Sequence, residues 1–198
     1  MSRLVLASGS PARARLLAGA GVPFTVQPAR VDEETLRQSL TAEGIRPREI
    51  ADALAELKAM RVSAQVPDAL VLGCDQLLLC EGRIFAKPEG RAGAEAQLRA
   101  LAGRTHELIT AQCIALAGSP IWRHVETPRL TMRALSEPVL AAYLDAEGDS
   151  VLSSVGAYLI EGRGVQLFER IEGSLFTVQG LALLPLLAFL RQHGVVPP

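Results

Sequence analysis

The chain has 198 residues, a length that suits one large α/β domain or two small lobes sharing a core. Hydrophobic residues make up 49% of it, while acidic and basic residues are mixed and give a formal net charge of −1. No basic tail or stripe suggests a nucleic-acid partner. The longest apolar stretch near the end, Gly180 to Leu190, is about half the length that a membrane-spanning helix needs.

The N-terminal and cysteine patterns both favour the cytoplasm. The apolar run from Leu4 to Leu6 is too short for a signal peptide. Cys74, Cys80 and Cys113 are widely spaced, without zinc-binding spacing or a paired disulfide framework. We therefore expect a cytoplasmic protein with no membrane partner, whose cysteines are small buried residues in a reducing compartment.

The chain is predicted to open with a strand, a glycine-containing turn and a helix. Arg3 to Ala7 indicates a short buried strand, which the run Ser8-Gly9-Ser10-Pro11 ends. Pro11 suits the first position of a helix, and Ser10 suits the N-cap before it. A second short strand over Phe24 to Gln27 leads into the acidic run Val31 to Glu34.

Strands and helices alternate through the rest of the chain, with hairpins in the middle. Apolar spacing predicts helices over 47–63, 93–101, 137–145 and 181–192, with Ser136 capping the third. Apolar runs predict strands over 69–72, 77–79, 83–86, 106–117, 122–132 and 165–171. Gly73 is expected to stop the first of these strands, and Glu81-Gly82 to form a hairpin turn. This order predicts an α/β domain with a mixed sheet.

The first candidate for chemistry is the turn from Ser8 to Arg13. A helix N-terminus presents free N–H groups and partial positive charge, so Arg13 there is unfavourable by roughly 0.3–1 kcal/mol. A bound anion would reverse that effect, and Gly9 would let the backbone approach a phosphate closely. The alternative is an ordinary capped helix with a surface arginine.

Lys58 is the second candidate. It follows Leu54 by four residues, so it borders the buried face of its predicted helix. Its ammonium could extend to solvent over apolar neighbours, or it could point into a cleft. The spacing alone leaves both interpretations open.

The third candidate is Gly73-Cys74-Asp75-Gln76, where a buried strand is followed by a carboxylate. Enzymes of the α/β class place reactive groups at strand ends, and an aspartate there can hold a divalent ion or take a proton from water. An aspartate that caps a turn is the alternative.

Two more motifs are candidates. Pro88 restricts Lys87 to an extended backbone. The acidic run Asp32-Glu33-Glu34 suits either metal binding or simple solvation.

Together these residues supply cations for phosphate oxygens and carboxylates for a metal. No Ser-His-Asp or Cys-His set accompanies them, and His106, His124 and His193 are isolated and expected to be ordinary strand or surface residues. The combination favours phosphoryl chemistry with water as the nucleophile.

The same residues resemble the signatures of Maf proteins. The matching segments run in order over almost the whole chain. They are Leu6 to Pro11 with Arg13 and Leu16-Leu17, Val31 to Glu33, Ala55 to Ala59, Gly73 to Gln76, Lys87-Pro88, Gly103 to His106, Val155 to Tyr158, Glu161-Gly162 and Phe168 to Gly173.

This resemblance implies a two-lobed α/β fold like that of inosine-triphosphate pyrophosphatases, a single domain over 1–198 whose long mixed sheet is flanked by helices around a central cleft. It implies a homodimer and a divalent cation, Mg²⁺ with Mn²⁺ or Co²⁺ as substitutes. The implied activity cuts a nucleoside triphosphate into a monophosphate and diphosphate. Asp75 would be the proton acceptor and would hold the metal with Glu33. The implied substrate-binding residues are Ser8, Ser10, Arg13, Lys58 and Lys87.

The resemblance also bears on which nucleotide the protein prefers. Gln76 and Glu161 resemble the branch that acts on 7-methyl-GTP, whose positively charged base a carboxylate would favour. Ala12 and Ser153-Ser154 match neither that branch nor the one preferring dTTP and UTP, so the dTTP/UTP preference stays open. The resemblance also leaves a nucleotide-binding regulator of cell division and septum formation as an alternative. A generic phosphatase or sugar-nucleotide enzyme on a similar sheet is a further alternative.

Overall fold

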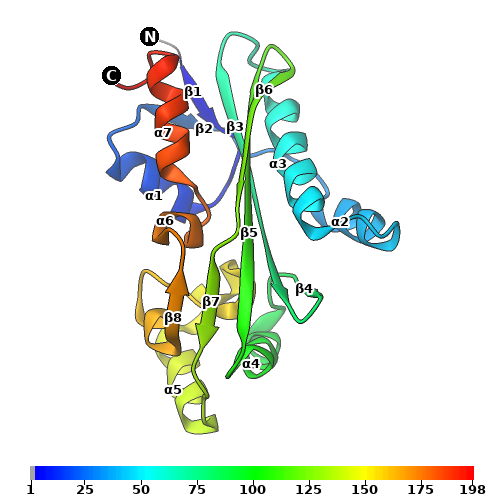
Figure 1. The fold of residues 1–198 in the computed structure, drawn as a ribbon, viewed down its shortest axis with the longest axis vertical. Coiled ribbons are helices and arrows are strands. Elements are labelled where there is room, and N and C mark those ends of the chain that lie inside the picture. Colours follow the sequence, from blue (N-terminus) through cyan, green and yellow to red (C-terminus); the bar gives the residue numbers. More distant parts are fainter. Residues whose placement is uncertain (1–2) are drawn as a thin grey trace. The chain divides into compact units, whose positions relative to one another are not determined.

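The computed structural model describes residues 3–198, and within them seven α-helices flank an eight-stranded mixed sheet (Figure 1). The strand order is β2-β1-β3-β5-β7-β8, with β4 paired to β3 and β6 paired to β5. The predicted α/β class with a mixed sheet is therefore confirmed. The chain divides into two compact units, the first built from residues 3–76, 110–126 and 174–198, the second from 77–109 and 127–173. One domain over 1–198 stays a prediction.

In the first unit, β1 (Leu4–Leu6) pairs in parallel with β2 (Phe24–Val26) and with β3 (Leu70–Cys80). Successive side chains of a strand point to opposite faces, and every residue of β1 and of the first part of β3 is buried, so the core lies on both faces of these two strands. Leu4, Leu6 and Leu72 pack with residues of α1 (Pro11–Gly19) and α7 (Leu183–Gln192). Val5 and Val71 pack on the other face with Val62 of α3 (Pro47–Ser63). Figure 1 shows α3 on the side of these strands opposite to α1 and α7.

Strand β3 continues through Gly73, so the prediction that this glycine ends the strand is wrong. A Cβ at Gly73 would lie 2.1 Å from the carbonyl oxygen of Ala55 and 2.6 Å from the backbone nitrogen of Ala59. The missing side chain therefore lets α3 pack directly against the strand. As a consequence, Asp75 lies inside a strand and not in a turn after one.

Helix α2 (Glu33–Ala42) was not predicted. The carboxylate of Asp32 caps it, because Oδ1 accepts from the backbone nitrogen of Thr35 at 3.1 Å. No residue of α2 is fully buried, and its apolar side is short, with Leu36 and Leu40 partly buried one turn apart. Glu33, expected either to bind a metal or to be solvated, is the first residue of this helix.

The first unit also contains β6 (Ser119–Glu126), α6 (Leu175–Val178) and part of β5 (Thr105–Leu116). The single strand predicted over 122–132 is wrong, because Thr127 and Pro128 separate β6 from β7 (Arg129–Met132). Proline has no N–H for the strand ladder. No helix within residues 3–198 combines the length and apolar content that crossing a membrane would need.

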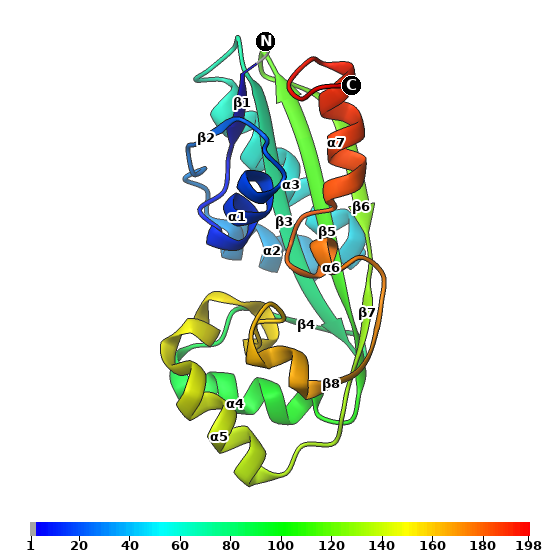
Figure 2. The same ribbon diagram turned by 90° about the vertical axis from the view of Figure 1, so that its left-hand side faces the viewer.

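The second unit holds β4 (Arg83–Phe85), β7 and β8 (Phe168–Glu172), with α4 (Gly90–Leu101) and α5 (Glu137–Glu147) side by side (Figure 2). The predicted hairpin at Glu81-Gly82 is confirmed, with φ of 48° and 80° at its two turn residues. Short 3-10 helices follow α5, namely η1 (Gly148–Ser153), η2 (Val155–Ala157) and η3 (Arg163–Leu167). The strand predicted from 165 therefore begins only at Phe168.

Candidate active site

The site begins where β1 leaves β3. Their pairing register ends at Leu6 and Leu72, and the backbone nitrogen of Ala7 then donates to the Leu72 carbonyl at 2.8 Å. The chain turns at Ser8 into α1, where Pro11 is the first helical residue and Ser10 is the N-cap, as predicted. Two residues after Leu72, the Cys74 carbonyl points to the same side of β3 and accepts hydrogen bonds from side chains.

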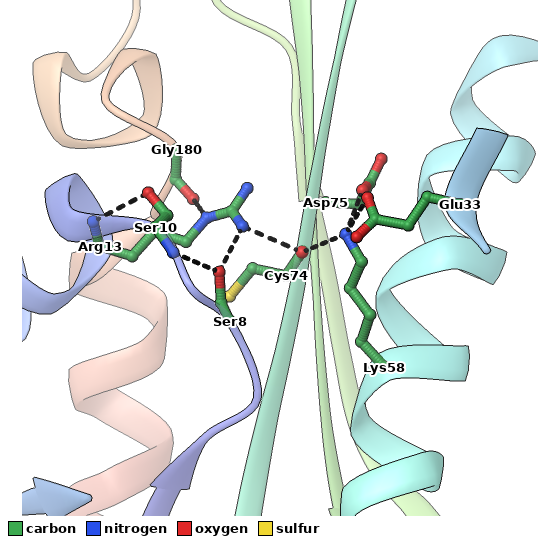
Figure 3. A network of polar contacts seen from close by, with 8 residues as sticks. All are labelled: Ser8, Ser10, Arg13, Glu33, Lys58, Cys74, Asp75 and Gly180. Atoms are coloured by element: carbon green, nitrogen blue, oxygen red, sulfur yellow. Dashed lines mark hydrogen bonds and ion pairs between the residues drawn. The ribbon is translucent and has the colours of Figure 1, made fainter. Parts of the chain in front are cut away.

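Arg13 is held in place by backbone and hydroxyl oxygens (Figure 3). Its Nε donates to the Gly180 carbonyl at 2.9 Å, and its Nη1 donates to Ser8 Oγ at 2.9 Å and to the Cys74 carbonyl at 3.1 Å. Within residues 3–198, Arg13 forms no ion pair and its Nη2 donates no hydrogen bond. A half-buried guanidinium with a free edge and no countercharge is suited to binding an anion.

Lys58 reaches the same region from α3. Its ammonium donates to Asp75 Oδ1 at 2.7 Å, to Glu33 Oε2 at 2.7 Å and to the Cys74 carbonyl at 3.3 Å. These contacts use the three hydrogens of the ammonium. The residue is 6% exposed, so the interpretation in which its charge extends to solvent is wrong.

The Cys74 carbonyl joins the two halves of the site. It accepts from Arg13 and from Lys58, whose helices α1 and α3 pack on opposite faces of β3, and the next residue is Asp75 (Figure 3). Two cations thus converge on one oxygen beside a buried carboxylate. The structure brings together six of the predicted residues, namely Ser8, Ser10, Arg13, Glu33, Lys58 and Asp75.

The charge state of Asp75 depends on opposing effects. Burial raises the pKa of Asp75 above its ordinary value, the charges of Lys58 and Arg13 oppose that shift, and Glu33 adds to it. We conclude that the pKa of Asp75 is raised, because its side chain is only 7% exposed. A raised pKa makes the carboxylate a better proton acceptor.

Glu33 and Asp75 have the donor chemistry of a magnesium site. Both carboxylates contact one ammonium, so they face a common point, and among residues 3–198 no hydrogen bond reaches Asp75 Oδ2 or Glu33 Oε1. No group of three or more His, Cys, Asp or Glu side chains forms a metal site in that part of the chain. Mg²⁺ typically binds one or two carboxylates together with substrate phosphates, so this pair fits it.

Gln76 is tied to neighbouring protein groups. Its Nε2 lies 2.8 Å from Thr110 Oγ1, 3.1 Å from the Thr177 carbonyl and 3.2 Å from the Val178 carbonyl. Ala12, the second predicted specificity residue of this unit, is half-buried in the first turn of α1. A role of either residue in choosing the base stays a prediction.

Lys87 and Glu161 belong to the second unit. The backbone around Lys87 is anchored on α4, because Gln97 Nε2 donates to the Ala86 carbonyl at 2.8 Å and Pro88 is buried. Gln97 Oε1 accepts from the backbone nitrogen of Gly156 at 2.9 Å, which fixes the segment after Ser153-Ser154. Both Lys87 and Glu161 are exposed, and their roles toward a substrate stay predictions.

The three histidines have partners outside the site. His106 is buried beside Tyr158, whose Oη lies 2.8 Å from its Nε2, and burial lowers the pKa of His106 to about 4. His124 pairs with Glu126, and His193 contacts the Phe189 carbonyl. The prediction that His106 is an ordinary strand residue agrees with this environment.

Gly180 and the Cys74 carbonyl were missed by the sequence reasoning. Gly180 has φ of 98°, and a Cβ there would lie 3.2 Å from Arg13 Nε, so both the backbone and the arginine favour glycine. It lies 167 positions after Arg13, and nothing local marks it. The Cys74 carbonyl is a backbone group, which residue types do not report.

Comparison with known proteins gives matches over the whole length. A family model described as Maf-like protein matches residues 3–193. The nucleoside triphosphate pyrophosphatase of Paramagnetospirillum magneticum is 52% identical over 194 residues, which are 98% of this chain and 100% of that protein. Nucleoside triphosphate pyrophosphatase 1 of Jannaschia sp. is 51% identical over 100% of both chains. A 7-methyl-GTP pyrophosphatase of Mesorhizobium japonicum is 47% identical over 98% of each chain.

Proposed function

The chain belongs to the Maf-like protein family, and on that premise we propose that it is a nucleoside triphosphate pyrophosphatase. The reaction hydrolyses a nucleoside triphosphate to a monophosphate and diphosphate by attack of water at the α-phosphorus. The observation that carries this proposal is the meeting of Arg13 and Lys58 on the Cys74 carbonyl beside the buried Asp75. The pyrophosphatase relatives, at about 50% identity over nearly the whole chain, support the same activity.

Arg13 binds the polyphosphate in this mechanism. Gly180, Ser8 and Cys74 hold the guanidinium by Nε and Nη1, which leaves Nη2 to donate to a phosphate oxygen. The start of α1 adds partial positive charge, and the backbone N–H of Ala12 adds a donor, since Pro11 has no N–H and that of Arg13 already donates to Ser10 Oγ. Both interactions strengthen as negative charge grows on the leaving diphosphate.

Asp75 accepts the proton of the attacking water. Its Oδ1 is occupied by Lys58, so Oδ2 is the oxygen available for this transfer. Lys58 keeps Asp75 and Glu33 fixed and supplies positive charge to the site. Its three hydrogens already donate to protein groups, so we assign Lys58 this electrostatic role in preference to direct phosphate binding.

Glu33 and Asp75 are the residues that would hold a divalent cation, for which Mg²⁺ is our proposal. When bound, such an ion withdraws charge from phosphate oxygens and lowers the pKa of a coordinated water. Glu33 Oε1 is available for this ion, Asp75 Oδ2 would be shared between the ion and the reacting water, and the phosphates of the substrate would complete the coordination.

For the base, we propose a preference for 7-methyl-GTP. The exposed carboxylate of Glu161 would favour the positive charge of a methylated guanine. A relative of 47% identity carries the name 7-methyl-GTP pyrophosphatase, which supports the same choice. A preference for dTTP and UTP is the competing outcome.

A panel of triphosphates tests the proposal. The protein is incubated with Mg²⁺ and 7-methyl-GTP, GTP, dTTP or UTP in water enriched in ¹⁸O, and both phosphate products are analysed. We expect diphosphate rather than orthophosphate, with the ¹⁸O label in the nucleoside monophosphate, because water attacks the α-phosphorus. Label in the diphosphate would mean attack at the β-phosphorus.

The remaining outcomes separate the competing functions. Release of orthophosphate would indicate a phosphatase, and binding without any hydrolysis would indicate a regulatory nucleotide-binding protein. Highest kcat/KM for dTTP or UTP would retain the reaction and overturn the 7-methyl-GTP preference. Omission of Mg²⁺ with added EDTA should abolish turnover, and readdition should restore it.

A further inference from the structure

We infer that Glu126 is a positioning residue for the proposed reaction, which holds the turn after α6 and, through that turn, the guanidinium of Arg13. The inference rests on the proposed function, because Arg13 acts there on the polyphosphate. Glu126 is the last residue of β6. The elements concerned, β6, α6 and α1, all belong to the first unit.

A row of alternate side chains on β6 holds Glu126 in place. Trp122, His124 and Glu126 lie on one face of the strand, because successive side chains alternate. Trp122 packs against the core cluster that contains Phe189 of α7, and the rings of Trp122 and His124 are 8° from parallel with centroids 5.8 Å apart. His124 Nε2 in turn lies 3.0 Å from Glu126 Oε1. One oxygen of the carboxylate is thereby fixed from its own strand.

The other oxygen of the carboxylate reaches α6. Glu126 Oε2 accepts from the hydroxyl of Thr177, which is fully buried. A hydrogen bond to a carboxylate is stronger than one between neutral groups. Because both oxygens of Glu126 have protein partners, we assign the residue a supporting role and no contact with the substrate.

Helix α6 ends in a turn that two backbone hydrogen bonds close. The nitrogen of Gly180 donates to the Thr177 carbonyl at 2.9 Å, and the nitrogen of Leu181 donates to the Phe176 carbonyl at 3.1 Å. This pair of bonds is the Schellman motif, in which glycine supplies the positive φ, here 98° at Gly180. The position of Gly180 therefore depends on the position of Thr177.

Gly180 links the turn to the active site. Its carbonyl accepts from Arg13 Nε at 2.9 Å (Figure 3). Hydrogen bonds thus join Glu126 to Thr177, Thr177 to Gly180, and Gly180 to the guanidinium. A misplacement of about 1 Å in a group that binds the substrate can cost about 100-fold in rate, so this support should affect turnover.

Other contacts of α6 should keep the fold when the Glu126 contact is lost. The hydroxyl of Thr110 on β5 donates to the Thr177 carbonyl at 3.1 Å, and Leu181 is fully buried in the core of the first unit. Loss of the Glu126 contact should therefore loosen the turn after α6 without unfolding the protein.

The first test compares Glu126→Leu with Glu126→Gln. Leucine removes the acceptor of the Thr177 hydroxyl, and we expect kcat/KM to fall by about 10- to 100-fold for the triphosphate that the wild type hydrolyses best. Glutamine keeps a side-chain oxygen that can accept the same hydrogen bond, so this variant should retain most of the activity. Equal losses in the two variants would mean that the charge of Glu126 acts by itself, and the inference would fail.

Thr177→Val tests the same contact from α6 and replaces Glu126→Leu if that variant does not fold. Valine removes the hydroxyl, so kcat/KM should fall by a similar factor, whereas Thr177→Ser keeps the hydroxyl and should stay near the wild type. The double variant of Glu126→Leu and Thr177→Val should lose no more than either single variant, because both remove one contact. Losses that multiply would overturn the inference.

A cycle with Arg13→Lys tests the route to the guanidinium. Lysine has a carbon where arginine has Nε, so the Gly180 carbonyl can no longer position the cation. Glu126→Leu should therefore cause a much smaller fall of kcat/KM in the Arg13→Lys background than in the wild type. The same fall in both backgrounds would show that Glu126 does not act through Arg13.

Glu107→Leu is the matched control. Glu107 is a strand glutamate whose side chain is 39% exposed, against 32% for Glu126, and it pairs with Arg129 on β7. This variant should keep the kcat/KM of the wild type. If the wild type hydrolyses no triphosphate, the proposed function fails and the inference with it. If the wild type is active and the folded Glu126→Leu and Thr177→Val variants match it, only the inference fails.

Discussion

The ammonium of Lys58 lies 2.7 Å from Oδ1 of Asp75, and each of the two side chains is 7% exposed. Helix α3 supplies the lysine and strand β3 supplies the aspartate, and Gly73 lets the two elements pack without an intervening side chain. Removing one member of such a buried pair leaves the other charge unpaired, which is costly. Removal of either partner should therefore lower the stability of the fold.

Asp75→Asn should lower kcat by roughly 100- to 10,000-fold, because the amide keeps an oxygen for Lys58 but takes no proton from water. The fold should persist, and circular dichroism and a melting curve would show it. Asp68→Asn, a change at an exposed aspartate shortly before β3, is the control and should keep full turnover. Near-normal hydrolysis by the Asp75 variant would refute its role as the base.

In the pH profile of kcat/KM, the fall on the acid side should occur at a pH above the usual pKa range of an aspartate, because burial raises the pKa of Asp75. As the pH falls through that raised value, Asp75 becomes protonated and accepts no proton, so the rate drops. Glu33→Gln should move this fall to lower pH, since the charge of Glu33 is one cause of the raised pKa.

Glu43→Gln is the control for this profile. Glu43 lies at the end of the same helix α2, where its carboxylate contacts only the Ser39 hydroxyl among residues 3–198. The acid side of the pH profile of this variant should coincide with that of the wild type. A Glu33→Gln profile that also coincides would contradict the assignment of the acid-side fall to Asp75.

Lys58→Met should lower the free energy of unfolding at pH 8 by about 3–5 kcal/mol, because Asp75 is left buried and charged. The loss should be smaller at pH 5. In the variant the folded-state pKa of Asp75 stands above its unfolded value, so the folded form binds the extra proton and gains stability as the pH falls. Urea unfolding at the two pH values measures both losses.

An equal loss at the two pH values would contradict this account of the Lys58 variant. Arg91→Met provides the comparison, because it breaks the exposed ion pair of Arg91 with Asp145. Exposed pairs contribute little, so its unfolding should stay close to that of the wild type at either pH.

Gly73→Ala should destabilise the protein by about 3 kcal/mol and reduce turnover, since the added methyl collides with backbone atoms of α3 and pushes Lys58 from Asp75. Gly19→Ala is the matched control, because a Cβ at Gly19 meets no atom within 4 Å. It should change stability by less than about 1 kcal/mol, in the stabilising direction. Thermal unfolding of both variants measures the difference in stability. Equal melting temperatures of Gly73→Ala and Gly19→Ala would contradict the predicted collision with α3.

Local sequence determined a large part of the fold. Apolar runs predicted β1 and the two ends of β3, and the spacing of apolar residues predicted α3. Ser10 and Pro11 marked the start of α1, and Glu81-Gly82 marked a hairpin. These features were predictable because capping, turn geometry and burial of a strand act between near neighbours in the chain. Helix α2 was not predicted, because its apolar side consists of only Leu36 and Leu40, which are partly buried, and most of its other residues are polar.

The sequence also supplied the candidate residues of the site, but only the tertiary structure decided how they meet. Packing of α1 and α3 on opposite faces of β3 brings Arg13 and Lys58 to one carbonyl, and the turn at Gly180 completes the support of Arg13. The reason is physical. Contacts between residues as far apart as 167 positions decide which backbone oxygen lacks a strand partner and which side chains lie near enough to donate to it.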